Sequence, residues 1–271
     1  MDNRPIGIFD SGLGGLTVVR ELMRQLPNER LVYFGDTGRV PYGSRSPEIV
    51  KRYAAQDCGF LLEQDVKYII AACGTVSSVA ADVLQALPVP AMGVVEPTAE
   101  AALAVSKTGR IGVIGTSVTV RSSSFERAIK RTRPDAQVFS QACPVLVTLV
   151  ESGWVEEDNT ATEAVARQYL EPFMEQRIDT LILGCTHFPL LSMIISRILG
   201  EDVTLINSGA TTAAKCTSLL TQRDMLAASD RTGGCRFFVS DQPHNFAGVA
   251  EMFLGRAVSE DVRQINMEGV G

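Results

Sequence analysis

The sequence contains few of the features that build metal sites, disulfide frameworks or membrane spans. It has two histidines, His187 and His244, and six cysteines without a Cys-x-x-Cys pair, so a structural zinc site is not expected. No apolar run approaches the length that spans a bilayer. The first residues lack the long apolar segment of a signal peptide. These absences predict a cytoplasmic protein without membrane attachment, whose cysteines are thiols.

A surplus of positive charge is also missing. The chain has 25 Lys and Arg and 31 Asp and Glu. The resulting formal net charge of −6 disfavours nucleic acid as a main partner. A basic cluster at Arg127, Lys130, Arg131 and Arg133 lies on a predicted helix, and we interpret it as a solvated face. The length of 271 residues and the 45% of hydrophobic residues are typical of a globular enzyme with one large domain or two smaller ones.

Two segments that match each other carry the strongest signal. Residues 66–75 (VKYIIAACGT) and 179–187 (DTLILGCTH) each read as a short buried strand that ends on a small residue followed by Cys. A thiol at a strand end that faces the start of a helix lies where the helix dipole and free amides stabilise a thiolate. Two such thiols, Cys73 and Cys185, could face one another across a cleft. That arrangement suits removal of a proton from one face of a carbon and its return to the other.

A second pair of segments repeats the correspondence in the same order. Residues 6–11 (IGIFDS) and 111–116 (IGVIGT) each read as an apolar strand upstream of one of the two cysteines, which favours internal duplication of an α/β unit. The pattern predicts parallel sheets covered by helices, with ligands at the carboxyl ends of the strands. We expect one domain from 1–95 plus 208–271 and a second from 96–207. Predicted helices are 17–26, 47–64, 77–84, 97–106, 122–131, 160–175 with a break near Pro172, and 190–199.

Three loops could carry chemistry. Residues 10–15 (DSGLGG) follow a strand and open a helix, so their amides could bind an anion such as a small carboxylate, although a tight glycine turn without a ligand is the simpler interpretation. They lack the glycine of a dinucleotide fingerprint and the lysine of a P-loop. Residues 36–43 (DTGRVPYG) offer a carboxylate, a guanidinium and a rigid turn. In residues 185–187 (CTH), an imidazole stands two positions from a thiol and could tune its pKa.

Together these motifs resemble the cofactor-independent glutamate racemases of the aspartate/glutamate racemase group. The resemblance extends from residue 7 to about residue 209, and it rests on FDSG at 9–12, GDT at 35–37, PYG at 41–43, AC at 72–73, IGT at 114–116, ACP at 142–144 and GCTHFP at 184–189. It implies an α/β fold of two pseudo-symmetric, doubly wound domains with parallel sheets and the active site in the cleft between them. It also implies a homodimer that needs neither pyridoxal phosphate nor a metal.

The resemblance further implies a role for each site residue. Cys73 and Cys185 would be the two acid/base thiols, with Asp10 assisting Cys73, and His187 and Glu151 assisting Cys185. Eleven residues fall where the family binds the substrate: Asp10, Ser11, Pro41, Tyr42, Gly43, Gly74, Thr75, Thr116, Thr119, Thr186 and His187. The implied reaction is interconversion of L- and D-glutamate, which would supply D-glutamate for bacterial peptidoglycan synthesis.

The chain departs from the family pattern at position 74, and other interpretations stay open. Gly74 stands where the family usually has an Asn that contacts substrate, and Asn207 and Thr211 replace two acidic residues. We therefore predict weaker substrate binding that Gly74→Asn would improve. Alternatives are a racemase of aspartate or another acidic amino acid, a cysteine hydrolase that uses Cys185 and His187, and a ligand-binding protein on the racemase scaffold.

Overall fold

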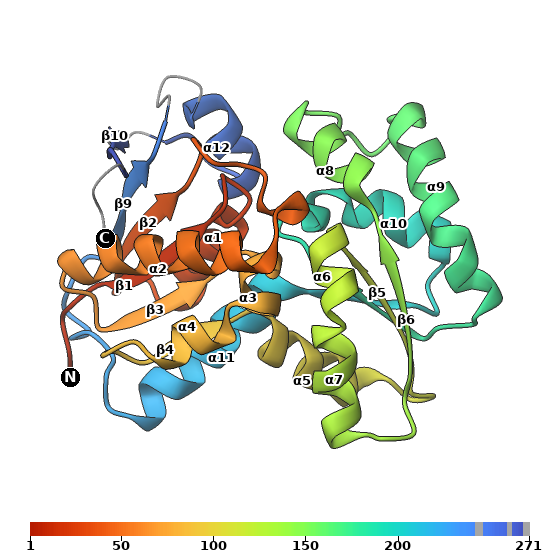
Figure 1. Ribbon diagram of the computed structural model, residues 1–271, viewed down its shortest axis with the longest axis horizontal. Coiled ribbons are helices and arrows are strands. Elements are labelled where there is room, and N and C mark those ends of the chain that lie inside the picture. The colour runs from red at the N-terminus through yellow and green to blue at the C-terminus, as the bar shows by residue number, and fades with distance from the viewer. Residues whose placement is uncertain (242–245, 259–261, 268–271) are drawn as a thin grey trace.

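The computed structural model describes residues 1–241, 246–258 and 262–267, so His244 lies outside the described residues. Strands and helices alternate along the chain, and they form two lobes that stand side by side (Figure 1). Each lobe is built on its own sheet, and every strand pairing among the described residues is parallel.

The two sheets share one strand order. The first sheet runs β10-β9-β2-β1-β3-β4 and the second runs β6-β5-β7-β8. In both sheets the first strand of the unit lies between the second and the third, and the fourth follows the third. The strands are Ile6–Asp10 (β1), Arg30–Gly35 (β2), Tyr68–Ala71 (β3), Ala91–Gly93 (β4), Arg110–Gly115 (β5), Gln137–Ala142 (β6), Thr180–Leu183 (β7), Thr204–Asn207 (β8), Gly234–Val239 (β9) and Val262–Gln264 (β10).

Helices cover both faces of each sheet, because the buried strands present apolar side chains in both directions. In the first sheet, Ile6 and Ile8 pack with α1, α11 and α12, whereas Phe9 packs with α2 and α3 on the other face. In the second sheet, Ile111 packs with α5 and α7, and Leu181 packs toward α9 and α10. The expected α/β architecture with two parallel sheets is therefore confirmed.

The predicted helices are present with three corrections, and the helices at 117–122, 144–151, 208–222 and 246–254 were not predicted. The expected break near Pro172 is wrong: α9 continues through it, and Phe173, the next residue, is buried in the core, so tertiary packing outweighs the cost of the proline. The helix predicted at 77–84 is two short helices, and the one predicted at 122–131 divides at Ser123, whose φ is 52°. The helices are α1 Leu16–Gln25, α2 Pro47–Glu63, α3 Gly74–Val79, α4 Ala81–Gln85, α5 Val95–Val105, α6 Ser117–Ser122, α7 Ser124–Thr132, α8 Pro144–Glu151, α9 Thr160–Glu175, α10 Ser192–Leu199, α11 Ser208–Gln222 and α12 Phe246–Leu254, with 3₁₀ turns η1 Tyr42–Ser44 and η2 Phe188–Leu191.

After the second sheet the chain returns to the first lobe. α11 packs against α1, and β9 lies in the first sheet between β2 and β10. These contacts agree with a first domain in two segments, but the boundaries at residues 95 and 208 stay a prediction. Within the described ranges, no helix combines the length and apolar character needed to cross a membrane.

Candidate active site

Each sheet has a point where the chain leaves adjacent strands in opposite directions. In the first sheet this point lies between β1 and β3, and in the second between β5 and β7. Loops that diverge at the carboxyl ends of parallel strands open a crevice, which is where α/β proteins bind ligands. Asp10 ends β1 and Cys73 follows β3, while Thr116 follows β5 and Cys185 follows β7. The topology therefore brings a thiol to the same place in both lobes.

The two crevices join in one cavity of about 230 Å³ between the lobes. Both cysteines line it, and both are more than nine-tenths buried. Of the predicted site residues, twelve line the cavity: Ser11, Pro41, Tyr42, Gly43, Cys73, Gly74, Thr75, Thr116, Glu151, Cys185, Thr186 and His187. Asp10 and Thr119 are not among the lining residues. Asp10 is buried beneath the glycine loop, and Thr119 lies behind Thr116, with their hydroxyl oxygens 3.0 Å apart.

The Cys73 side of the cavity favours a neutral thiol. Cys73 precedes α3, and its Sγ lies 3.6 Å from the Ser11 hydroxyl. Burial raises the pKa of Cys73 to about 12, and the negative charge of Asp10 adds to this rise, whereas the Val76 amide and the Ser11 hydroxyl lower it. The expected stabilisation of a thiolate by the helix start is thus outweighed here. A fully buried sulfur loses more hydration than one amide returns.

The Cys185 side is a chain of three polar groups. The Cys185 Sγ lies 3.6 Å from Nδ1 of His187, and Nε2 of His187 lies 3.2 Å from Oε1 of Glu151. Burial lowers the pKa of His187, but the negative charges of Cys185 and Glu151 and their hydrogen bonds outweigh it and raise the pKa to about 10. The imidazole is therefore protonated at neutral pH. The protonated ring can donate a hydrogen bond to the Cys185 sulfur, 3.6 Å away.

The glycine loop after β1 serves the carboxylate that precedes it. Oδ2 of Asp10 accepts hydrogen bonds from the amides of Gly12 and Gly15, at 3.2 and 3.0 Å. Two of the amides that could have bound an external anion are thus used within the loop. Added side chains would not fit, because a Cβ at Gly14 would overlap Thr186. Burial raises the pKa of Asp10, which the charge of His187 and the loop amides oppose.

Gly74 is the point where the two lobes come closest at the site. A Cβ at this position would overlap the carbonyl oxygen of Gly184, which belongs to the other lobe. Next to it, the hydroxyls of Thr75 and Thr116 lie 3.0 Å apart and join α3 to the start of α6. The structure therefore has no room for an Asn side chain at position 74. The prediction that Gly74→Asn would improve binding is not supported, because the cavity is closed around glycine.

One wall of the cavity was absent from the sequence prediction. The α8 residues Pro144, Val147 and Thr148 line it, and Glu151 is the last residue of this helix. Pro144 stands at the first helical position, which is a usual place for proline and was a signal for this helix. Further lining residues are Gly12, Val40, Ser44, Ser117 and Gly184.

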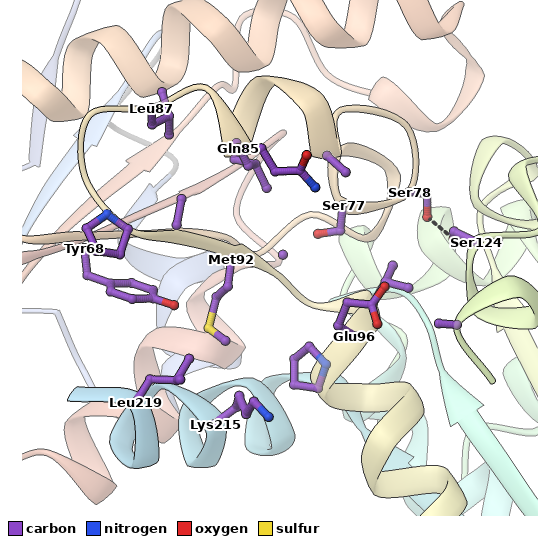
Figure 2. Close-up of a pocket in the computed structure, with 18 of the residues that line it drawn as sticks. Tyr68, Ser77, Ser78, Gln85, Leu87, Met92, Glu96, Ser124, Lys215 and Leu219 are labelled. Atoms are coloured by element: carbon purple, nitrogen blue, oxygen red, sulfur yellow. Dashed lines mark hydrogen bonds between the residues drawn. The ribbon is translucent and has the colours of Figure 1, made fainter. Parts of the chain in front are cut away.

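A larger cavity, of about 780 Å³, lies at the β4 edge of the first sheet (Figure 2). Tyr68, Met92 and Leu219 contribute to its apolar part, and Ser78 and Ser124 are joined by a 2.9 Å hydrogen bond at one end. None of the described residues that line it has a thiol or an imidazole. No three His, Cys, Asp or Glu side chains in the described ranges are grouped to bind a metal. The acid/base groups are therefore concentrated in the smaller cavity.

A fold of two similar parallel sheets with paired thiols at their switch points defines a class of α/β racemase-like proteins. The model of the Asp/Glu/Hydantoin racemase family matches residues 6–216, and the chain belongs to this family. It is 46% identical to a glutamate racemase from Geobacter metallireducens over 98% of this chain and 97% of that protein. It is 44% identical to one from Neisseria meningitidis, over 99% and 97%.

Solved structures give the same relationship in three dimensions. A glutamate racemase isoform from Bacillus anthracis superposes with a TM-score of 0.92 at 41% identity, over 97% of this chain and 98% of the other. The Francisella tularensis glutamate racemase, solved in complex with D-glutamate, superposes with 0.91 at 38% identity, over 99% of both chains. An aspartate racemase from Picrophilus torridus, at 14% identity and a TM-score of 0.59 over 81% of this chain and 94% of that one, shares the fold alone.

Proposed function

We propose that the protein interconverts L- and D-glutamate by acid/base chemistry of Cys73 and Cys185. The observation that carries this proposal is the placement of the two thiols in one small cavity, each at the switch point of its own sheet. Full-length similarity to glutamate racemases supports glutamate as the substrate. A racemase needs an acid and a base on opposite faces of Cα, which two lobes related by a common topology supply.

In one direction of the proposed reaction, Cys185 is the base and Cys73 is the acid. The thiolate of Cys185, paired with His187, takes the proton from Cα, and the two electrons of the broken C–H bond stay on the carbon. Cys73 then gives its thiol proton to the other face, so that one sulfur gains the proton that the other loses. The reverse direction starts from the opposite proton states. The small, closed cavity limits water at the carbanion.

Polar groups around the cavity can hold the rest of the substrate. Hydroxyls of Ser11, Thr75, Thr116 and Thr186, with the turn that starts at Pro41, are placed to meet the charged ends of an acidic amino acid. Oδ1 of Asp10 is buried and has no hydrogen-bond partner among the described residues. Because Asp10 does not line the cavity, it acts on Cys73, whose pKa its negative charge raises, rather than on the substrate.

The wider role belongs to this proposal as well. D-glutamate made by this reaction would supply peptidoglycan synthesis in the cytoplasm of a bacterium. The active form would be a homodimer that uses no cofactor, and each subunit would have the domains 1–95 plus 208–271 and 96–207. Family resemblance supports these points.

The test is an assay of optical rotation with L-Glu, D-Glu, L-Asp and D-Asp. Racemisation of both glutamate enantiomers, with aspartate slower, is the expected result. Faster turnover of aspartate would favour the second candidate, a racemase of aspartate or another acidic amino acid. Binding without turnover would indicate a ligand-binding protein. Hydrolytic activity that persists in Cys73→Ala would indicate a cysteine hydrolase.

A further inference from the structure

A buried polar network lies directly beneath the turn that starts at Pro41. Nε of Arg39 donates to Oδ2 of Asp36 at 2.6 Å, and its Nη2 donates to Oδ1 of Asp57 at 2.9 Å. The Tyr42 hydroxyl contacts both carboxyl groups: it donates to Oδ2 of Asp36 and lies 3.1 Å from Oδ2 of Asp57. Asp36, Tyr42 and Asp57 are fully buried. Oδ1 of Asp36 accepts from the Ser240 hydroxyl at 2.8 Å.

The network contains too few hydrogen atoms to form all of its contacts if both carboxyl groups are ionised. A phenol has one hydrogen to donate. Tyr42 donates it to Asp36, the closer of its two carboxyl partners. The contact between Tyr42 and Oδ2 of Asp57 would then join two oxygen atoms without a hydrogen between them. A proton on Asp57 supplies the missing hydrogen, which the acid donates to the Tyr42 oxygen. Its other oxygen remains free to accept from Arg39.

The charges lead to the same assignment. Two ionised carboxylates and one guanidinium would leave a net negative charge in a buried cluster, which is costly. With a proton on Asp57, the positive Arg39 and the negative Asp36 balance. We propose that Asp57 carries a proton in the folded protein and, through Tyr42 and Arg39, positions the turn Tyr42–Ser44 at the wall of the cavity.

The surroundings of Asp57 agree with this proposal. Burial raises its pKa well above the usual value, and the negative charges of Asp36 after β2 and Asp10 on β1 add to the rise, while Arg39 and the Tyr42 hydroxyl lower it. On its own helix, α2, the neighbouring Cys58 is a buried thiol whose pKa is raised to about 12, by burial first and by Asp57 second. The one cation facing Asp57 among these groups, Arg39, is shared between Asp57 and Asp36, so one positive charge faces two carboxyl groups.

The turn links this network to the substrate cavity. Pro41 and Gly43 line the cavity, and a Cβ at Gly43 would press against Thr116 of the other lobe. A shift of Tyr42 would therefore move two of the lining residues. The positioning role rests on the proposed function of the cavity, but the protonation of Asp57 does not.

Protonation is tested by stability, without any activity assay. In Asp57→Asn, an amide replaces the acid, donates to Tyr42 and accepts from Arg39, but does not titrate. A carboxyl whose pKa is raised on folding stabilises the protein fully below the unfolded value, near 3.9, and this stabilisation is lost as the pH rises toward the folded value. We expect the unfolding constant of the unaltered protein, relative to Asp57→Asn, to rise about tenfold per pH unit between pH 5 and 7 in urea titrations.

Asp82→Asn is the matched control, because Asp82 is exposed and pairs with Lys51 on the same lobe. Its relative unfolding constant should stay within about twofold over this pH range. A relative constant for Asp57→Asn that is independent of pH would overturn the proposal, because Asp57 would then be ionised in both states. Failure of Asp57→Asn to fold would also overturn it, since the amide reproduces both hydrogen bonds of the protonated acid.

The positioning role has its own readout. Asp57→Ala should raise the KM for glutamate roughly tenfold, the loss of one buried hydrogen bond, with kcat changed less, and Asp57→Asn should restore the KM at pH 7. Equal losses in both variants would remove the positioning role. If the unaltered protein does not racemise glutamate, the proposed function fails, while the stability experiment still decides whether Asp57 is protonated.

Discussion

The ends of β3 and β7 are equivalent positions in two similar sheets, yet their thiols have different polar neighbours. Cys73 lies beside a carboxylate and a hydroxyl, and its pKa is raised to about 12 by burial and by Asp10. Cys185 lies 3.6 Å from His187, a cation whose own pKa is raised to about 10 by Cys185 and Glu151 despite burial. The backbone position alone therefore does not set the polar surroundings of the thiol. The side chains that each lobe adds around its strand end do.

This difference shows how a duplicated unit can become a two-base site. In the proposed reaction, Cys73 donates a proton, and Cys185, which lies beside the His187 cation, accepts one. Both roles are needed at once for a proton to leave one face of Cα as another enters the opposite face. The predictions below alter one side at a time, and they begin with the largest expected effect.

Removal of either thiol should abolish the reaction. Each turnover needs one abstraction and one donation, so Cys73→Ala and Cys185→Ala should each reduce kcat by more than about a thousandfold in the optical assay. Cys235→Ala is the control, because Cys235 stands near the amino end of β9, at the opposite edge of the sheet. Substantial racemisation by Cys73→Ala would contradict the assignment of the two sides.

Removal of the imidazole should affect the Cys185 side more than the Cys73 side. His187→Ala takes away the cation beside Cys185, so proton transfer by Cys185 should slow by roughly a hundredfold. Transfer by Cys73 should slow less. Since a catalyst leaves the equilibrium ratio unchanged, the asymmetry has to be measured as Cα isotope effects in the two directions. Equal changes in the isotope effects of the two directions would show that His187 does not act specifically on Cys185.

A side chain at position 74 should push the two lobes apart. Gly74→Asn would overlap the Gly184 carbonyl, and overpacking of this kind costs about 1–3 kcal/mol. We expect the KM for glutamate to rise roughly tenfold, since 1.4 kcal/mol is a factor of ten. Gly248→Ala is the control, because its Cβ would meet open space. A lower KM in Gly74→Asn would show that the lobes separate without cost and that the missing amide matters more.

The smallest effect is expected at Glu151, which contacts His187 and not Cys185 itself. Glu151→Gln removes a half-exposed negative charge 3.2 Å from His187, so the pKa of His187 should fall from about 10. His187 would then lose its proton at a lower pH, and the alkaline limb of the rate profile should move to lower pH, with a loss of about threefold at pH 8. NMR titration of the imidazole checks the shift, with Glu156→Gln as the control. An unchanged titration would remove Glu151 from the chain.

Local patterns explain why much of this arrangement was predictable. Cys73 and Cys185 each follow an apolar strand and small residues, so the sequence alone placed them at strand ends. Asp10 and Thr116 followed from the repeated strand upstream. Parallel strands joined by helices leave few topologies, and the same order in both sheets agrees with duplication.

The parts that were not predicted depend on contacts between distant segments. The raised pKa of Cys73 is a consequence of burial between two lobes, which outweighs the local rule for a helix start. The closure at Gly74 depends on Gly184, 110 positions away in the sequence. Asp57 belongs to no sequence motif. Its contact with Tyr42 depends on how α2 packs in the fold.

The most direct measurement of the two-sided account is racemisation of L-glutamate in heavy water. Thiols exchange with solvent, so the donating sulfur carries deuterium, while the abstracting sulfur retains the substrate proton until product leaves. Early D-glutamate should therefore contain deuterium at Cα, and unreacted L-glutamate should remain protiated, as followed by NMR or mass spectrometry. Early product that retains the original proton would indicate a single base that serves both faces and would contradict the account.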